Sequence, residues 1–219
     1  MLIRGVKSLI PKGVKMHLEF LVEELSVEMA LHNLLPKLVT GEHTYKIITF
    51  QGKQDLLKKV TMELRGYRRW IPQDFKIIVL VDRDSQDCHE LKEHLENCAK
   101  AAGLVTKTQS AGGTFTVMNR IAIEEIESWY FGDPDAVRAA YPKISTNFHK
   151  KAKFRYPDQI GGGTWEALEK LLKSKGYYRH GLRKTELARD ISKHMEPLKN
   201  RSKSFQIFWH GITEIITDN

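Results

Sequence analysis

Three aspartates follow the most apolar stretch of the sequence directly. The run at residues 77–81 ends in Asp82-Arg83-Asp84, and Asp87 comes three residues later. Carboxylates this close together repel one another unless a cation lies between them. Such hard oxygen ligands favour Mg²⁺ or Mn²⁺, which keep several water ligands and bind phosphate oxygens at the same time. The spacing therefore points to metal-assisted chemistry on phosphates.

A second acidic pair follows an earlier apolar stretch. Residues 20–22, Phe-Leu-Val, are followed by Glu23 and Glu24. In open α/β sheets, binding sites form at the carboxyl ends of the strands. If both stretches are parallel, central strands, we expect Glu23 to meet Asp82 and Asp84 at one edge of the sheet.

An Asp-x-Asp pair is a weak signal by itself. It occurs in glycosyltransferases, in haloacid-dehalogenase-type phosphatases, and by chance at helix starts. In the simpler alternative, Asp84 or Asp87 caps the following helix and Asp82 is merely exposed. A phosphatase that uses Asp82 as its nucleophile is disfavoured, because that motif normally sits on the first strand. Gln86 also stands where Thr or Val would be expected.

Strand and helix patterns alternate from residue 17 to about residue 123. The pattern predicts strands over 17–22, 45–50, 75–81, 104–108 and 114–123, and helices over 25–38, 53–66 and 87–102. This alternation predicts an α/β fold with a mostly parallel sheet flanked by helices. The unbroken apolar run at 75–81 indicates a strand that is covered on both faces.

The pattern changes after residue 142. Residues 143–163 are basic and aperiodic, and amphipathic helices are predicted to begin near Thr164, Lys184 and Ser204. We therefore expect an N-terminal extension over 1–15 and an α/β domain over 16–142. A basic loop and a helical C-terminal region would make up residues 143–219.

Composition indicates an ordinary globular chain. Of its 219 residues, 41% are hydrophobic and 28% are charged. No apolar run approaches the roughly 18 residues that a membrane helix needs, and the first 15 residues do not resemble a signal peptide. Two cysteines, Cys88 and Cys98, are typical of a reducing compartment. We expect a cytoplasmic protein that does not enter a membrane.

The positive charge is concentrated in one region. Residues 1–142 hold 19 basic and 19 acidic residues, whereas residues 143–203 hold 16 basic and 6 acidic ones. A local basic excess beside a neutral, acid-bearing region is typical of a protein with a polyanionic partner, here nucleic acid. The candidate phosphate contacts are Lys150, Lys151, Lys153, Arg155, Arg179, Arg183 and Lys184. Phe148, Phe154 and Tyr156 lie among them and could stack on bases. The alternative is a solvated lysine-rich surface over core aromatics.

The order and spacing of several short motifs resemble those of a known domain. The segments FLVEELSVEMALHNLLPKL and IIVLVDRDSQD resemble the Toprim domain of topoisomerases, bacterial primases and overcoming-lysogeny-type nucleases. Further segments resemble one Toprim-like family of unassigned function, which is often encoded beside ABC-type ATPases in phage-defence operons. Its motifs correspond here to Val22-Glu23-Glu24 with Glu28, Asp82-Arg83-Asp84, Glu125-Ile126-Glu127-Ser128-Trp129 with Asp133, and Ser202-Lys203-Ser204-Phe205.

The resemblance implies a Mg²⁺- or Mn²⁺-dependent nuclease that acts with a partner ATPase. Asp82 and Asp84 would hold the metals, Glu23 would ligate or act as general base, and Glu127 would complete the site. Glu24 departs from the family, which has glycine there. Alternatively, Glu127 is a helix-start acid beside a core tryptophan. A different class of protein remains open, namely a non-catalytic Toprim-like subunit that binds nucleic acid or the ATPase.

Overall fold

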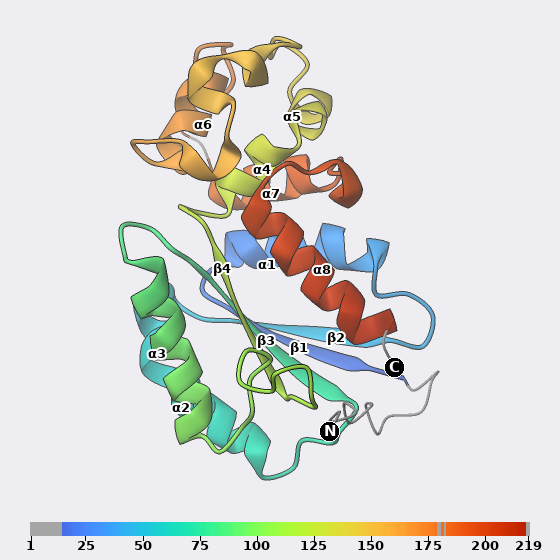
Figure 1. The fold of residues 1–219 in the computed structure, drawn as a ribbon. Helices are drawn as coiled ribbons and strands as arrows, with labels where there is room; N and C mark the ends of the chain where they lie inside the picture. The colour runs from blue at the N-terminus through green and yellow to red at the C-terminus, as the bar shows by residue number, and fades with distance from the viewer. Residues whose placement is uncertain (1–14, 179–180, 182, 218–219) are drawn as a thin grey trace, which may run out of the picture.

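A parallel sheet organises the part of the chain that the structure describes. The computed structural model describes residues 15–178, 181 and 183–217. Its four strands are β1 (His17–Val22), β2 (Thr44–Thr49), β3 (Phe75–Asp82) and β4 (Val117–Ala122). They lie in the order β2-β1-β3-β4, and every neighbouring pair is parallel (Figure 1). The predicted α/β class with a parallel sheet is confirmed.

Helices connect the strands and extend beyond the last one. In chain order they are α1 (Leu25–Leu34), α2 (Lys53–Arg68), α3 (Cys88–Ala101), α4 (Glu127–Gly132), α5 (Pro134–Ala140), α6 (Thr164–Lys173), α7 (Lys184–Ser192) and α8 (Lys203–Thr217). Single 3-10 turns lie at Leu35–Lys37, Phe148–Lys150, Ala152–Phe154, Pro157–Gln159 and Pro197–Lys199. None of the helices in the described ranges is long and apolar enough to cross a membrane.

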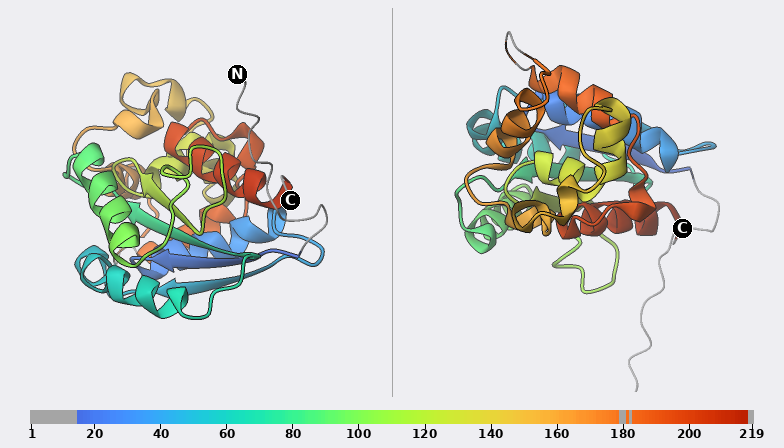
Figure 2. Two further views of the ribbon diagram at one scale, coloured as in Figure 1. Left: turned by 60° about the horizontal axis from the view of Figure 1, so that its bottom comes forward. Right: turned by 90° about the horizontal axis from the view of Figure 1, so that it is seen from above.

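The sheet is covered on both faces. Ile77, Val79 and Val81 of β3 pack with the apolar residues of α2 and α3. Ile78 and Leu80 point the other way, into a core shared with α1 and α8. Figure 2 shows the same arrangement, with α2 and α3 on one side of the sheet and α8 on the other. Residues 77–81 of β3 are therefore all apolar because both faces of the strand are buried there.

The C-terminal region packs into the same core as the sheet. The Trp129 ring of α4 lies 5.1 Å from the ring of Phe205 and 4.9 Å from that of Phe208. Its indole nitrogen donates a hydrogen bond to Ser204 Oγ over 3.0 Å. Trp129 is thus a core residue, as the simpler alternative held. The motif that contains Trp129 and the motif that contains Ser204 and Phe205 therefore contact each other and hold α8 against α4.

The basic loop is anchored to the start of α8. Asp158 Oδ2 accepts from the backbone nitrogens of Lys203 and Ser204, over 2.5 and 3.2 Å. Its Oδ1 accepts from Ser202 Oγ over 2.7 Å. An acid at this position satisfies backbone donors that the first turn of a helix leaves unpaired. The lysines of the loop are therefore carried on a fixed backbone.

The predicted strand over 104–108 is wrong. Only Thr106 forms a β-bridge, to Val117, and β4 begins at Val117 rather than at residue 114. The Thr106 hydroxyl donates to the Glu96 carboxylate and accepts from the backbone nitrogen of Gln109. Such local side-chain hydrogen bonds compete with a β ladder. The segment therefore folds as a turn although its residues favour a strand. Residues 1–14 of the predicted N-terminal extension lie outside the described residues.

Gly132, the last residue of α4, allows residues 200–202 to pack closely against that helix. A Cβ there would overlap the side-chain oxygen of Asn200 and lie 2.9 Å from the backbone nitrogen of Ser202. Asn200 also donates to the carbonyl of Trp129 over 2.8 Å, so its amide moves only by losing a buried hydrogen bond. We expect Gly132→Ala to lower the free energy of unfolding in urea by about 1–3 kcal/mol.

Gly66→Ala supplies the matched control. A Cβ at Gly66, on the exposed side of α2, meets no atom within 4 Å in the described structure. Because alanine is the better helix former, this change should raise the free energy of unfolding by up to about 1 kcal/mol. If both substitutions stabilise the protein equally, residues 200–202 do not pack against α4 as described.

Candidate functional site

The sheet reverses its strand order between β1 and β3. The chain leaves β1 through α1 on one face and leaves β3 through α3 on the other (Figure 1). In open α/β sheets a crevice opens at such a point, because the two loops diverge. Glu23 follows β1 directly and Asp82 is the last residue of β3. The expected meeting of these two residues at one edge of the sheet is confirmed.

Glu23 and Asp82 form a buried pair of carboxyl groups. Each is about 95% buried, and their side chains hydrogen-bond to each other. Burial raises the pKa of Glu23 to about 7, and the hydrogen bond from Asp82 only partly opposes this. Burial also raises the pKa of Asp82 well above its usual range, and the carboxylates of Glu23 and Glu127 add to the rise. Without a cation, the pair therefore shares a proton near neutral pH.

Glu127 and Tyr130 add two more buried polar groups. Glu127 is the first residue of α4 and is 1% exposed. Burial raises its pKa to about 8, although the nearby Lys184 ammonium favours the charged form. Burial and then the carboxylates of Glu127 and Asp82 hold the pKa of Tyr130 well above its usual range. Within the described residues, Glu127 Oε2 and the Tyr130 hydroxyl find no hydrogen-bond partner.

Tyr130 was not among the predicted site residues. It lies three residues after Glu127 on α4, a spacing that places two side chains on one side of a helix. That spacing is the signal that could have identified it. Core packing was expected for Trp129 alone, which is correct, and Tyr130 is buried in the same core.

Lys184 was predicted to contact nucleic acid, but its ammonium lies at the acidic site. Its Nζ is 3.7 Å from Glu24 Oε1 and 5.1 Å from the centre of the Trp165 ring. Burial alone would lower the pKa of Lys184, but the carboxylates of Glu127 and Glu24 outweigh burial and raise it. Lys184 therefore serves as a counter-ion for the acids.

Glu24 does not distort the backbone at the position where the resembled family has glycine. Its φ of −147° and ψ of 163° are extended values that any residue adopts. Its carboxylate accepts a hydrogen bond from Ser26 Oγ and pairs with Lys184. The side chain is thus held by α1 and α7 rather than left pointing freely into the crevice.

Asp84 lies at the rim of the crevice and is paired with a lysine. Its side chain is 47% exposed, and its carboxylate lies 3.1 Å from Lys53 Nζ. Lys53 also donates to the carbonyl of Arg83 over 2.9 Å. The carboxylate of Asp84 contributes to the raised pKa of Glu23, so the groups are close enough to interact. Lys53, at the first position of α2, was not predicted, and it is a second cation at the acidic edge.

The loops after β3 and β4 are clamped together in a strained conformation. Asp84 and Glu124 have φ values of 52° and 62°, in the left-handed region that non-glycine residues rarely adopt. The backbone nitrogen of Asp84 donates to the carbonyl of Glu124 over 2.7 Å, and the Arg83 guanidinium pairs with the Glu124 carboxylate. Each such residue costs on the order of 1 kcal/mol or more, and residues of this kind cluster at functional sites.

The acids fit a divalent cation in part. Among the residues that the structure describes, no three His, Cys, Asp or Glu side chains are arranged to hold a metal ion. Glu23 Oε2 is buried without a donor in the same described set, so it is free to accept a cation. Mg²⁺ is commonly bound by one or two carboxylates together with waters and substrate phosphates. The Glu23–Asp82 pair fits that mode, whereas Asp84 and Glu127 are not yet in reach.

The predicted phosphate contacts of the basic loop are exposed. Lys150, Lys151, Lys153 and Arg155 all face solvent on the turns between α5 and α6. Phe148 and Phe154 are buried against Phe131, so the suggestion that they stack on bases is wrong, whereas Tyr156 is 60% exposed. Arg183 is exposed and pairs with Glu186. Arg179 lies outside the described residues.

The fold and the site together define an α/β protein with paired, buried acids at the switch point of a parallel sheet. The chain belongs to the family described as Domain of unknown function (DUF4276), whose model matches residues 22–213. That range contains every strand-end acid of the site. No curated protein matches the chain, and no solved structure matches it.

The raised pKa of Glu127 predicts a pH-dependent stability. Between about pH 4.5 and 8, folded Glu127 keeps a proton that the unfolded chain has released, so stability should fall as the pH rises through this window. One pKa unit corresponds to about 1.4 kcal/mol, which makes the loss on the order of a few kcal/mol. Glu127→Gln should flatten this fall, as measured by urea unfolding with chelator at pH 5 and pH 8.

Glu93→Gln, on the exposed side of α3, controls for the loss of one carboxyl group. It should leave the difference in stability between the two pH values unchanged. The burial of Glu127 would be contradicted if the two variants showed the same pH dependence.

Proposed function

We propose that this chain is a Toprim-like nuclease that hydrolyses phosphodiester bonds with Mg²⁺ or Mn²⁺. The observation that carries the proposal is the buried Glu23–Asp82 pair at the strand-order reversal. Two carboxyl groups in contact cannot both ionise cheaply without a cation. The order of the acidic motifs, one after the first strand and one after the third, supports the Toprim-like assignment.

Glu23 and Asp82 would hold the cation. Asp84 would become a further ligand by giving up its ion pair with Lys53 and binding the cation instead. A bound Mg²⁺ or Mn²⁺ would supply positive charge for the phosphate and lower the pKa of a bound water. Glu23, whose pKa is about 7 while no cation is bound, would lose its proton when the cation binds, because the positive charge stabilises the carboxylate. Glu127 and the Tyr130 hydroxyl can each donate a proton or a hydrogen bond into the same space.

The basic loop would hold the nucleic acid. Its exposed Lys150, Lys151, Lys153 and Arg155 lie on a backbone that Asp158 fixes to α8. Lysine and arginine neutralise phosphates, and an exposed tyrosine such as Tyr156 can stack on a base. Lys184 is not part of this proposed contact surface, because its ammonium pairs with Glu24 at the acidic site.

The partner and the setting rest on the resemblance alone. Members of the resembled family are often encoded beside ABC-type ATPases in phage-defence operons. We therefore propose that the chain is the effector partner of such an ATPase in the cytoplasm. Assays of activity should include that ATPase, because an isolated effector can be held inactive.

A non-catalytic role is the second candidate, and a specific observation favours it. Lys53 and Lys184 already pair with Asp84 and Glu24. Two ammonium groups offset much of the acidic charge without any metal. In this alternative the acids and lysines form a structural network, and the chain binds nucleic acid or the ATPase without cutting.

Metal binding predicts a stability response that depends on Asp82. A cation that binds only the folded protein, at about 100 times its Kd, should raise the Tm by about 5–10 °C. Asp82→Asn should abolish the response to Mn²⁺, because it removes one half of the carboxyl pair. The measurement is calorimetric Tm with Mn²⁺ against chelator.

Asp135→Asn makes the same chemical change on the exposed surface of α5, where Asp135 pairs only loosely with Arg138. This variant should keep the full response to Mn²⁺. If Mn²⁺ raises the Tm of wild type and of both variants equally, the cation binds elsewhere and the proposed metal site is contradicted.

Binding and cleavage should be separable by mutation. Asp84→Ala is expected to eliminate cleavage while leaving affinity for nucleic acid unchanged or slightly higher, since it removes a negative charge near phosphate. Replacing Lys150, Lys151 and Lys153 together by alanine should weaken binding and reduce the log–log salt slope by roughly 0.7 per lost single-strand contact. Nuclease assays and titrations at several salt concentrations give both values.

Replacing Lys170, Lys173 and Lys175 by alanine removes the same charge from another exposed surface and is the control. A complex that binds nucleic acid but never cuts with Mg²⁺ or Mn²⁺ would favour the non-catalytic alternative. Equal losses from both lysine triples would contradict the role of the basic loop.

A further inference from the structure

One side of α2 is lined by exposed residues that suit a polyanion. Lys58, Met62 and Arg65 of α2 and Arg69, which follows its last residue in helical conformation, lie at intervals of four, three and four residues, so they share one side of the helix. All four are exposed, and Met62 is 66% exposed. At 1.5 Å per residue this α2 stripe is about 16 Å long. It ends beside Trp70, which is 57% exposed.

The charges of the α2 stripe are not neutralised by nearby acids. Within the described ranges, no ion pair involves Lys58, Arg65 or Arg69. Asp55, in the first turn of α2, is paired with Lys59 over 2.6 Å. The dipole of a helix favours basic residues at its C-terminal end. The dipole does not explain, however, why the large apolar side chains of Met62 and Trp70 are exposed on the same side of α2.

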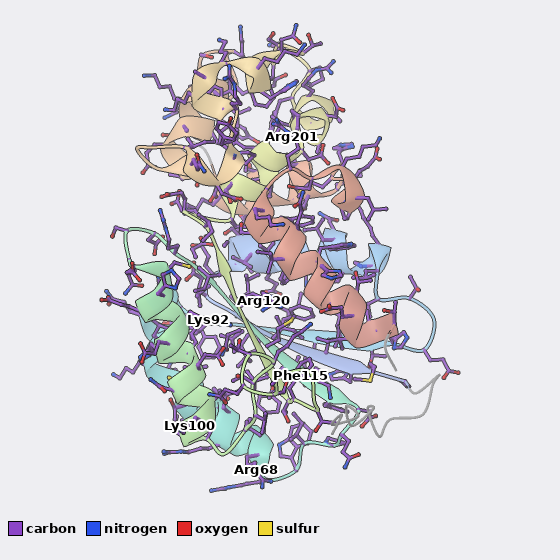
Figure 3. All side chains as sticks on the ribbon, viewed as in Figure 1. Arg68, Lys92, Lys100, Phe115, Arg120 and Arg201 are labelled. Atoms are coloured by element: carbon purple, nitrogen blue, oxygen red, sulfur yellow. The ribbon has the colours of Figure 1, made fainter. Side chains whose placement is uncertain are left out.

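Trp70 is exposed and yet held in place. Its ring lies 5.4 Å from that of Tyr67 and meets the ring of Phe75 edge-on at 5.8 Å. Its backbone nitrogen donates to the carbonyl of Tyr67 over 3.0 Å. Arg68, which donates to the carbonyl of Gly103 over 3.2 Å, lies at the same end of the molecule as Lys100 (Figure 3). An indole fixed among basic side chains is a platform on which a base can stack.

The other end of the α2 stripe reaches the acidic edge of the sheet. Lys58 lines a cleft of about 670 Å³ together with Ser85, Gln86 and Asp87, the residues that follow Asp84. The first residue of α2 is the lysine that pairs with Asp84. A strand that leaves the acids through this cleft would therefore lie directly on the α2 stripe.

We propose that the α2 stripe is a track for single-stranded nucleic acid, running from the cleft beside Asp84 to Trp70. Lys58, Arg65 and Arg69 contact phosphates, and a base stacks on Trp70. The track is separate from the basic loop: Arg68, beside its end, and Arg201, beside the loop, lie at opposite ends of the molecule (Figure 3). It deepens the proposed nuclease function, because it defines the path of the substrate away from the acids.

The test measures binding in the full chain carrying Asp82→Asn, so that cleavage does not affect the result. The probes are fluorescein-labelled 20-nucleotide oligo-dT and oligo-U, titrated by anisotropy at several salt concentrations. Trp70→Ala should weaken binding roughly 5- to 100-fold, whereas Trp70→Phe should keep most of the affinity. Arg65→Ala with Arg69→Ala should lower the log–log salt slope by about 1.4 in total.

Two controls distinguish the track from a general loss of charge or of folding. Lys170→Ala with Lys173→Ala removes two charges elsewhere and should leave the slope unchanged, and urea unfolding shows whether each variant folds. The proposal is overturned if the α2 variants bind like wild type. It is also overturned if Trp70→Ala loses binding to phosphatidylserine vesicles but not to the oligonucleotides. If the α2 variants lose affinity while wild type never cuts with Mn²⁺ even in the presence of the partner ATPase, the track is supported and the nuclease function is contradicted.

Discussion

The contact between the buried carboxyl groups of Glu23 and Asp82 is the constraint on which the rest of the site depends. Two such groups buried in contact need a shared proton or a cation between them. The raised pKa values of Glu23, Asp82 and Glu127 favour the protonated forms, which relieves the repulsion between the carboxylates. The ammonium groups of Lys184, beside Glu24, and Lys53, beside Asp84, offset part of the remaining negative charge. A divalent cation with its waters and a phosphate would be a third way to neutralise the acids.

The rest of the fold keeps the acids in contact. Parallel register between β1 and β3 brings the strand ends together, and the helices that leave them lie on opposite faces. The packing of Trp129 against Phe205 and Phe208 of α8 then fixes α4, which places Glu127 near Asp82. Sequence motifs that look like further site residues, Ser204 and Phe205 among them, thus act by holding α4 in place.

Much of this arrangement could be predicted from the sequence, for physical reasons. Alternation of strand and helix patterns predicts the parallel sheet, and acids at two strand ends then predict the meeting of Glu23 with Asp82. The alternative that Asp87 caps the following helix is confirmed, because its side chain accepts hydrogen bonds from the backbone nitrogens of His89 and Glu90 in α3. These inferences need only local periodicity and the geometry of one sheet.

The remainder depends on contacts between distant parts of the chain. In the sequence, nothing distinguishes Lys184 from the other basic residues of the C-terminal region. It lies beside Glu24 because α7 packs against α1. Local spacing likewise does not show that Asp84 pairs with Lys53. The segment 104–108 has strand-forming residues, yet the side-chain bonds of Thr106 to Glu96 and Gln109 turn it away from the ladder.

The most direct test of a cation at the Glu23–Asp82 pair is anomalous diffraction from crystals of the full chain grown with Mn²⁺. We predict one anomalous peak between Glu23 and Asp82, about 2 Å from an oxygen of each carboxylate. We also predict that the hydrogen bond between the two side chains is then broken. A structure in which Mn²⁺ binds elsewhere, while Glu23 and Asp82 stay hydrogen-bonded to each other, would contradict the metal site.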